Sequence, residues 1–394
     1  MSVKSVERAR ASNGTGSLAI LQLIRSGQAS TRAELARVTG LSRSTISQRV
    51  DELIARGLVV VGDDSVSTGG RPPGALLFNG NAGYVLAVDC GASRTRLGIA
   101  NLGGELVIEH TDYLDIAEGP EKVLDWMESH LRRMISEAEL DDSPLLGIGV
   151  GLPGPVEHST GRPVRPPIMP GWDGYPVADQ LSSQFGVLAL VDNDVNIMAL
   201  GEHRIFHPDS ADFLFVKIST GIGCGMVING NIHRGAHGAA GDIGHINVAG
   251  HEDVQCACGN FGCLEAVASA RALATQLSDI SSDSDKVEQI VAQVLGGRPD
   301  AIAKLREAGR EIGGVLAMLV NAYDPDVLVV GGHLAEADQP LIAGIREVIY
   351  RRSPPLATYN LRIERSQLGD RSGVVGCALM VADHILDREE SSGN

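Results

Sequence analysis

The chain has few aromatic residues and lacks any long hydrophobic run. Aromatic side chains make up only 4% of its 394 residues, whereas glycine occurs 48 times. No apolar stretch reaches the roughly 18 residues of a membrane-spanning helix, so we expect no membrane span. The amino terminus, MSVKSVERARASNG, has no apolar segment of the kind that a secretion signal requires. The hydrophobic content of 43% is still ample for sizeable cores, and abundant glycine favours an α/β protein of two or three domains.

Positive charge is scarce and unevenly placed. The chain carries 33 Lys and Arg against 49 Asp and Glu, which gives a net charge of −16. Residues 1–75 hold 10 basic and 6 acidic side chains, whereas the remainder holds 23 basic and 43 acidic ones. Because contact with phosphate needs Lys or Arg locally, we expect that only the amino-terminal segment could meet nucleic acid.

Cysteine is also scarce, and half of the six cysteines fall within eight residues. The isolated ones fit a reducing cytoplasm, and they are Cys90, Cys224 and Cys377. The clustered ones follow a histidine with the spacing H-x10-C-x-C-x4-C, formed by His245, Cys256, Cys258 and Cys263. One imidazole and three thiolates are the ligand set of a closed tetrahedral site, so we predict a structural Zn²⁺ there. The alternative is a set of free cysteines in a glycine-rich loop, able to act as a redox pair.

The first eighty residues begin with the pattern of a helix-turn-helix. Apolar spacing predicts a helix over Ser17–Ser26. Thr31 and Glu34 form a capping box, which predicts a second helix that runs to about Val38. The dipeptide Thr39-Gly40 then makes a tight turn into a third helix.

The third helix begins after Ser42 and stops at Gly57, and two strands follow it. These strands, Leu58–Val61 and Ala75–Phe78, flank a polar tip and are typical of a wing. The side chains that could reach base edges or phosphates of operator DNA are Ser42, Arg43, Ser44, Ser47, Gln48 and Arg49, with Arg71 in the wing. A helical packing module without a role in DNA binding is the alternative. Two operator half-sites would require a homodimer or a homotetramer.

The rest of the chain reads as an α/β architecture of two lobes. The segments YVLAVDCGASRTRLGIANLGGELVIEH and DFLFVKISTGIGCGMVINGNIHRG share one order of strand, glycine-rich turn, strand, turn and strand. We interpret them as two copies of one β-hairpin module, each of which opens a lobe. A buried strand is predicted over Val327–Val330. Helices are predicted over Pro120–Glu139, Pro176–Phe185, Asn196–Phe206, Ala266–Ser278, Ala301–Tyr323 and Pro340–Arg351.

Residues 83–385 resemble the ROK family of repressors, open reading frames and sugar kinases. The motifs that carry the resemblance are DCGASRT at 89–95, GLPGPV at 151–156, PGW at 170–172, DND at 192–194, STGIGCG at 219–225, RGAHGAAGDIGHI at 234–246 and CACGNFGCLE at 256–265. The resemblance implies an actin-like, hexokinase-like body of two ribonuclease-H-like repeats with a sugar in the interlobe cleft. We therefore expect a winged helix over residues 1–80, a first lobe over 81–195 and a second lobe over 196–394.

The resemblance also implies roles for individual residues around the sugar. The expected sugar contacts are Gly154, Asn193, Asp194, Asp242, His245 and Glu265. In kinases of this family the residue matching Asp194 is the base that takes a proton from the attacking hydroxyl. Asp242 stands where the family usually has Glu, and the shorter side chain alters which hydroxyl it can reach. Trp172 lies in a segment that lines the same cleft in relatives, although core packing explains it equally well.

Phosphate-facing positions of the family fall on both glycine-rich turns and one further turn. They are Asp89, Gly91, Ser93, Thr95, Thr220, Gly221, Gly223, Gly225, Gly331 and Gly332. Ala92 and Arg94 depart from the common kinase pattern Gly-Gly-Thr-Lys. Tight hairpin turns also demand glycine without any ligand, so these glycines alone are weak signals of a nucleotide site.

Three functions compete at this point. The first is a sugar-responsive DNA-binding regulator, most simply a repressor, which binds operator DNA and a sugar effector. The second is a sugar kinase that uses Mg-ATP, with Asp194 as general base. The third is a zinc-stabilised interaction scaffold with an empty cleft. The added winged helix, Asp242 and the altered first turn favour the regulator.

Overall fold

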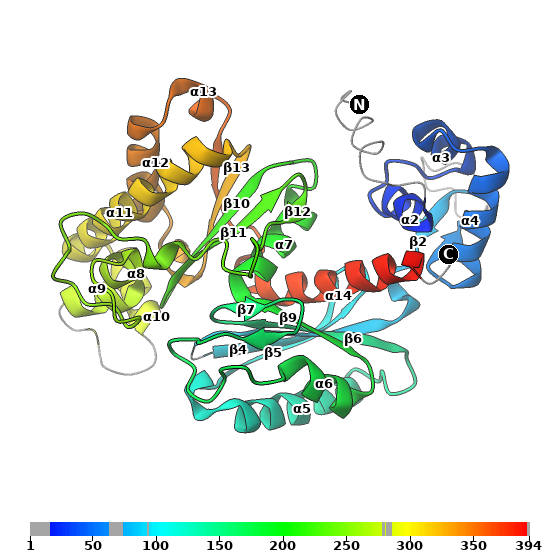
Figure 1. Ribbon diagram of the computed structural model, residues 1–394, viewed down its shortest axis with the longest axis horizontal. Helices are drawn as coiled ribbons and strands as arrows, with labels where there is room; N and C mark the ends of the chain where they lie inside the picture. Colours follow the sequence, from blue (N-terminus) through cyan, green and yellow to red (C-terminus); the bar gives the residue numbers. More distant parts are fainter. Residues whose placement is uncertain (1–15, 63–73, 93, 278–279, 281–285, 392–394) are drawn as a thin grey trace.

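The computed structural model describes residues 16–62, 74–92, 94–277, 280 and 286–391. Figure 1 shows a small amino-terminal domain beside a body of two lobes. Within this described part of the chain, no helix is long and apolar enough to cross a membrane.

The amino-terminal domain is a winged helix. Its elements are α2 (Ser17–Arg25), α3 (Arg32–Thr39), α4 (Arg43–Ala55), β1 (Val59–Val61) and β2 (Leu76–Phe78). The predicted capping box is present, because Thr31 accepts from Glu34 N while the Glu34 side chain reaches back to the N-cap backbone. Gly40 ends α3 with a φ of 74°, a left-handed conformation that glycine adopts without strain. β1 and β2 pair in antiparallel fashion, and the tip between them, with Arg71, lies outside the described residues.

The two lobes repeat one sheet topology, which confirms the predicted duplication. The first sheet has the order β5-β4-β3-β6-β9 and the second the order β12-β11-β10-β13-β14. In each, a three-stranded antiparallel meander is followed by two strands parallel to its first strand. The first set is β3 (Tyr84–Cys90), β4 (Arg94–Asn101), β5 (Leu106–Tyr113), β6 (Leu145–Leu152) and β9 (Leu188–Asn193). The second set is β10 (Phe213–Ile218), β11 (Ile222–Ile228), β12 (Asn231–Ile232), β13 (Val327–Gly331) and β14 (Arg362–Arg365).

Helices cover the outer faces of both sheets. The first lobe uses α5 (Pro120–Glu137) and α6 (Val177–Phe185), with the small hairpin β7 (Val156–Glu157) and β8 (Arg162–Pro163) beside them. The second lobe uses α8 (Leu264–Ala268), α9 (Ala270–Gln276), α10 (Lys286–Leu295), α11 (Pro299–Tyr323) and α12 (Gln339–Arg352), followed by the short α13 (Pro355–Thr358). The prediction of a single helix over Ala266–Ser278 is wrong, because the helical conformation is interrupted at Ser269. The hydroxyl of Ser269 accepts from Ala272 N and caps α9.

Two helices fill the space between the sheets. α7 (Asp194–Phe206) packs on the inner face of the second sheet, and α14 (Ser372–Ser391) packs on the inner face of the first. They cross closely because a β-carbon at Gly201 would lie 2.5 Å from Ser372 O. A β-carbon at Gly376 would likewise overlap Ile197 O. Figure 1 shows α14 as the long red helix between the lobes and the amino-terminal domain.

The position of α14 alters the expected domain division. Residues Val374 and Val381 of α14 share one hydrophobic cluster with Val85 and Ala87 of β3. The range 196–394 expected for the second lobe therefore includes a helix that completes the first lobe. Alternation along β3 explains the arrangement, because Leu86 and its neighbours two residues away point to the opposite, α5-covered face.

The winged helix is joined to the body through the same helix. Buried residues of α2 and β2, including Ile20 and Leu76, belong to the hydrophobic cluster that contains α14. Asp383 of α14 adds a polar link, since its Oδ1 accepts from Arg25 of α2 at 3.0 Å. Its Oδ2 lies 3.2 Å from the guanidinium of Arg204 in the last turn of α7. One carboxylate thus contacts both the winged helix and the helix between the lobes.

Candidate functional site

A cavity of about 520 Å³ lies between the two lobes. Its wall takes residues from the ends of β3 and β9 and from the segment that follows β6 in the first lobe. In the second lobe it takes residues from β10, β11 and the zinc-type loop (residues 245–263). All the predicted sugar positions line it, namely Gly154, Asn193, Asp194, Asp242, His245 and Glu265. The structure therefore brings together residues that are up to 111 positions apart in the sequence, from 154 to 265.

Asn193 holds the junction between β9 and α7. Its Oδ1 accepts from Val195 N at 2.9 Å and from Asn196 N at 3.3 Å, so it caps α7. Its Nδ2 donates to Gly154 O at 3.0 Å. The amide therefore ties together two of the segments that line the cavity. Asn193, and not Asp194, is the residue that caps the helix.

Asp194 is buried at the first position of α7 and faces a cation that the sequence reasoning missed. Its Oδ1 accepts from Val195 N at 2.8 Å, and its Oδ2 accepts from Lys217 Nζ in a short ion pair. Burial lowers the pKa of Lys217, but the carboxylates of Asp194 and Asp89 outweigh burial and raise this pKa above its ordinary value. Lys217 thus stays charged in the cavity wall. The signal in the sequence was a lone lysine within the apolar strand FLFVKI.

Asp89 is the second carboxylate near Lys217. Burial raises the pKa of Asp89 to about 6, against the opposing attraction of Lys217 and Arg96. The repulsion of Asp194 adds to the effect of burial. Two acidic groups and one ammonium thus share the floor of the cavity, and Asp89 changes its charge near pH 6.

The predicted phosphate-facing positions divide into three groups. Those that line the cavity are Asp89, Gly91, Thr220, Gly221, Gly223 and Gly332. Thr95 does not, because it is fully buried with its hydroxyl 3.3 Å from Cys90 Sγ. Gly225 and Gly331 are packing positions instead, since a β-carbon at the first would overlap Ala199 and one at the second would overlap the Phe215 ring. Ser93 lies outside the described residues.

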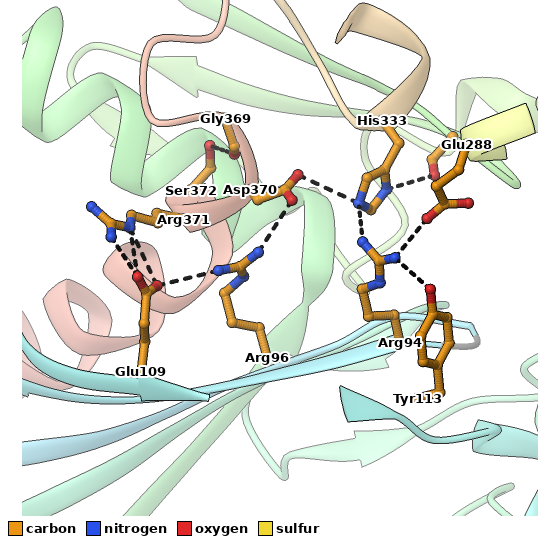
Figure 2. A network of polar contacts seen from close by, with 11 residues as sticks. Arg94, Arg96, Glu109, Tyr113, Glu288, His333, Gly369, Asp370, Arg371 and Ser372 are labelled. Carbon is orange, nitrogen blue, oxygen red and sulfur yellow. Dashed lines mark hydrogen bonds and ion pairs between the residues drawn. The ribbon is translucent and has the colours of Figure 1, made fainter. Parts of the chain in front are cut away.

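A network of charged side chains begins at Arg94 and Arg96 of β4, the strand that follows the first glycine-rich turn, as Figure 2 shows. Arg94 donates to Glu288 Oε1 of α10 at 2.7 Å and to the Tyr113 hydroxyl at 2.9 Å. Its other terminal nitrogen lies 3.5 Å from His333 Nε2, at the start of the 3₁₀ segment η4 (His333–Ala337). Since Arg94 belongs to the first lobe and Glu288 and His333 to the second, these contacts bridge the lobes.

The network continues toward α14 through a second arginine. Arg96 donates to Asp370 Oδ2 at 3.1 Å and to Glu109 Oε2 at 3.2 Å. Asp370, in η5 (Gly369–Arg371), also lies 3.4 Å from His333. The hydrogen bond from His333 lowers the pKa of Asp370 despite its burial. Both arginines, which line the cavity, are thus paired with carboxylates.

The candidate ligands of the zinc-type loop converge on one point. The ligand atoms of His245, Cys256, Cys258 and Cys263 all lie within 4.8 Å of one another. Cys256 Sγ lies 3.7 Å from His245 Nδ1, and Cys258 Sγ lies 3.7 Å from Cys263 Sγ. Ligand atoms bound to one tetrahedral zinc lie about 3.5–3.8 Å apart, so the donor set fits this ion. A ligand role for Nδ1 would leave Nε2 of His245 available to the cavity that His245 lines.

Glu265 follows this loop in the first turn of α8. Its Oε2 accepts from Ile222 N at 3.2 Å and thereby joins α8 to the second glycine-rich turn. A β-carbon at Gly221 would lie 2.5 Å from this oxygen, which explains the glycine there. Asp242 is exposed at the cavity wall. Trp172 belongs to the core, because it is fully buried and its Nε1 donates to Ile116 O at 3.0 Å.

The predicted DNA-contacting side chains lie on and before α4. Ser42 caps the helix, since its hydroxyl accepts from Thr45 N at 3.2 Å. Arg43, Ser44 and Gln48 are exposed, while Ser47 and Arg49 are half-buried. The exposed face of α4 is opposite its buried residues, which include Ile46 and Val50. An arginine in the first turn of the exposed helix is the arrangement by which such helices contact DNA.

Comparison of the sequence with models of protein families shows to which family the chain belongs. The model of the ROK family matches residues 85–384, and that of the MarR family matches residues 15–66. The chain belongs to the ROK family. Its ROK body begins in β3 and extends into α14, and a MarR-type winged helix precedes it.

Relatives of this ROK chain include both regulators and kinases. The xylose repressor of Caldicellulosiruptor bescii is 30% identical over 388 residues, which cover 95% of this chain and 96% of that protein. The glucokinase of Halalkalibacterium halodurans is 30% identical over 324 residues, covering 78% of this chain and 98% of that enzyme. A crystal structure of a ROK family transcriptional regulator, homologous to the E. coli MLC protein, has a TM-score of 0.81 at 24% identity. It covers 99% of this chain and 100% of its own, so the whole fold is shared.

Proposed function

We propose that this ROK protein is a sugar-responsive transcriptional repressor. Its winged helix binds operator DNA as part of a dimer or tetramer, and a sugar effector binds in the interlobe cavity. The observation that carries the proposal is a hydrophobic cluster that the winged helix shares with α14. The same helix packs on the sheet of the first lobe, so the DNA-binding domain and the body have a common core. The full-length similarity to a xylose repressor supports it.

The cavity supplies the chemistry that a sugar requires. Asp242 and Glu265 offer carboxylate oxygens to hydroxyl donors, and Nε2 of His245 offers one further polar contact. Zn²⁺ held by the three loop cysteines and His245 would fix the position of His245 and of the adjoining Glu265. A cavity with these polar groups in its wall also speaks against the scaffold hypothesis, which needs no ligand site.

α7 provides a direct route from the cavity to the DNA-binding domain. The helix begins at Asp194 in the cavity wall and extends about 15 Å to Arg204 in its last turn. Arg204 meets Asp383, and Asp383 meets Arg25 of the winged helix. A sugar that binds one lobe arrangement better than the other would therefore change the setting of the DNA-binding domain.

A sugar kinase is the second candidate, and specific contacts weaken it. Asp194 lies in the cavity as a kinase base should, and a glucokinase is among the relatives. However, Lys217 Nζ is paired with one oxygen of Asp194, and Arg94, beside the first glycine-rich turn, is paired with Glu288 of the second lobe. Both contacts would have to open before Mg-ATP and a sugar could react in line.

A paired assay on the full-length protein tests the proposal. A duplex selected from random DNA by the protein itself serves as the operator, and binding is followed by fluorescence anisotropy across a panel of sugars. We expect one sugar class to release the duplex, and no ATP consumption above that of Asp194→Asn. Arg43→Ala should weaken duplex binding by roughly 10- to 100-fold and leave sugar affinity unchanged. Sugar-dependent ATP turnover that Asp194→Asn abolishes would instead establish the kinase.

A further inference from the structure

A cluster of metal-ligating side chains lies on the first lobe, on the sheet face that α5 covers. His110 and Asp112 come from β5, and His130 comes from α5. One candidate ligand atom from each lies within 4.8 Å of the other two. None of the three lines the interlobe cavity. The cluster therefore needs an explanation apart from sugar binding.

His110 has an unsatisfied ring nitrogen. Its Nε2 is buried and has no hydrogen-bond partner in the described part of the chain. The nearest carboxylate oxygen, Asp112 Oδ2, lies 4.0 Å away, which is too far for a hydrogen bond. Asp112 uses its other oxygen, Oδ1, to accept from Tyr113 N at 2.8 Å. A buried polar atom without a partner is costly unless some further group satisfies it.

His130 is held in the orientation that metal-binding histidines use. Its Nδ1 lies 2.8 Å from Trp126 O, one turn earlier on α5, and donates a proton to this carbonyl. The neutral ring then carries its free lone pair on Nε2. Histidine ligands commonly donate their second ring nitrogen to a backbone carbonyl in this way. The His130 ring also stacks on Trp126, with 4.0 Å between ring centroids.

The backbone that carries the three side chains is rigid. His110 and Asp112 are two residues apart on a strand, so they point to the same face of the sheet. His130 sits on a helix whose Met127 and Leu131 are fully buried against that sheet. The rings of His110 and His130 lie 5.7 Å apart at an angle of 20°.

We propose that His110, Asp112 and His130 bind one divalent transition-metal ion, with zinc as the preferred occupant. Two imidazoles and one carboxylate form a ligand set typical of zinc, and they leave further positions open to water. Ligand atoms on one zinc ion lie about 3.5 Å apart, so side-chain movement of roughly 1 Å brings the three into position. The bound ion cross-links edge strand β5 to α5 and satisfies Nε2 of His110.

Trp126 makes the site directly measurable. Full-length protein with metal retained in the cysteine loop is titrated with Ni²⁺, a paramagnetic ion that quenches nearby indole fluorescence. We expect saturable quenching at one ion per chain, and Zn²⁺ added first should prevent it. Trp126→Phe should abolish this quenching but still take up the additional equivalent of Ni²⁺ by elemental analysis. Trp172, the other tryptophan of the chain, is buried in the core.

Two ligand variants and a control decide the outcome. His130→Gln and His110→Gln should each weaken Ni²⁺ binding by at least tenfold, with far-ultraviolet circular dichroism unchanged. His237→Gln removes an exposed histidine outside the cluster and should bind like the parent protein. Quenching of equal affinity in the parent and both ligand variants, or no additional equivalent of ion, overturns the proposal.

Discussion

At the scale of single residues, burial brings the pKa of the Asp89 carboxyl closer to neutrality. Its pKa of about 6 in the folded protein lies above the ordinary value of 3.8, and burial is the main cause. The folded state therefore binds more protons than the unfolded state between about pH 4 and pH 6. The stability that this proton contributes is full at the acidic end of that window and is lost as the pH rises through 6.

Asp89→Asn removes this pH dependence and tests it. We expect the free energy of unfolding of the parent protein, relative to that of the variant, to fall by about 1 kcal/mol between pH 5.5 and pH 7.5. Denaturant titrations of both proteins at the two pH values measure the difference, and other titrating groups cancel in the comparison. If the free energies of unfolding of the two proteins change equally between the two pH values, Asp89 ionises as a solvated carboxyl does.

The sequence predicted which carboxylates lie in the cavity, but it did not predict which residues form ion pairs across the two lobes. Asp194 and Glu265 stand in family motifs, so the resemblance placed them, and the structure brings both to one cavity. Arg94 meets Glu288, which is 194 positions away, and Arg96 meets Asp370, which is 274 positions away. No local spacing can indicate such pairs, because only the packing of the two lobes brings them together.

At the scale of elements, local signals identified some helices and missed others. The capping box at Thr31 was readable because its hydrogen bonds lie within four residues. α14 was missed because it is buried against a sheet, α7 and the winged helix. Its residues from Val374 to Ala382 are nearly all buried, so the polar face that gives a helical period is absent. α10 likewise escaped prediction.

The loop of the three cysteines should depend on a bound metal ion, and Cys258→Ser tests this dependence. We expect the midpoint of thermal unfolding to fall by on the order of 5 °C and the sugar response to weaken with it. The reason is that His245 and Glu265 adjoin the loop and both line the cavity. Scanning calorimetry and the anisotropy assay measure the two effects. The control, Asp253→Asn, changes an exposed residue of the same loop. An unchanged sugar response in metal-free protein would contradict this role.

At the scale of the whole molecule, the duplicated lobes could be predicted but their joining could not. Two hairpin modules are visible in the sequence because each repeats the same order of strands and turns. The return of α14 to the first lobe depends on contacts between Gly201 and Gly376, which are made only after both lobes exist. The ion pairs of Asp383 with Arg25 and Arg204 likewise form only when the winged helix and both lobes are in place.

Asp383→Asn tests whether that link transmits the signal. Partly exposed ion pairs add little stability, so we expect a change of less than about 1 kcal/mol in unfolding free energy. The ratio of operator affinities with and without sugar should nevertheless fall severalfold from a starting coupling of roughly 5- to 150-fold. Glu347→Gln, which breaks the two ion pairs of this α12 residue with Arg306 and Arg310 of α11, is the matched control. If this ratio of operator affinities is equal in both variants and the parent, Asp383 does not transmit the effect of sugar to the winged helix.

The return of the last helix to the first sheet also bears on how the protein is made. During translation, one face of that sheet stays uncovered while some 180 further residues, from 194 to 371, leave the ribosome. The nascent first lobe must therefore wait for α14 before it can close its core. The winged helix, which packs against the same helix, gains its support at the same moment.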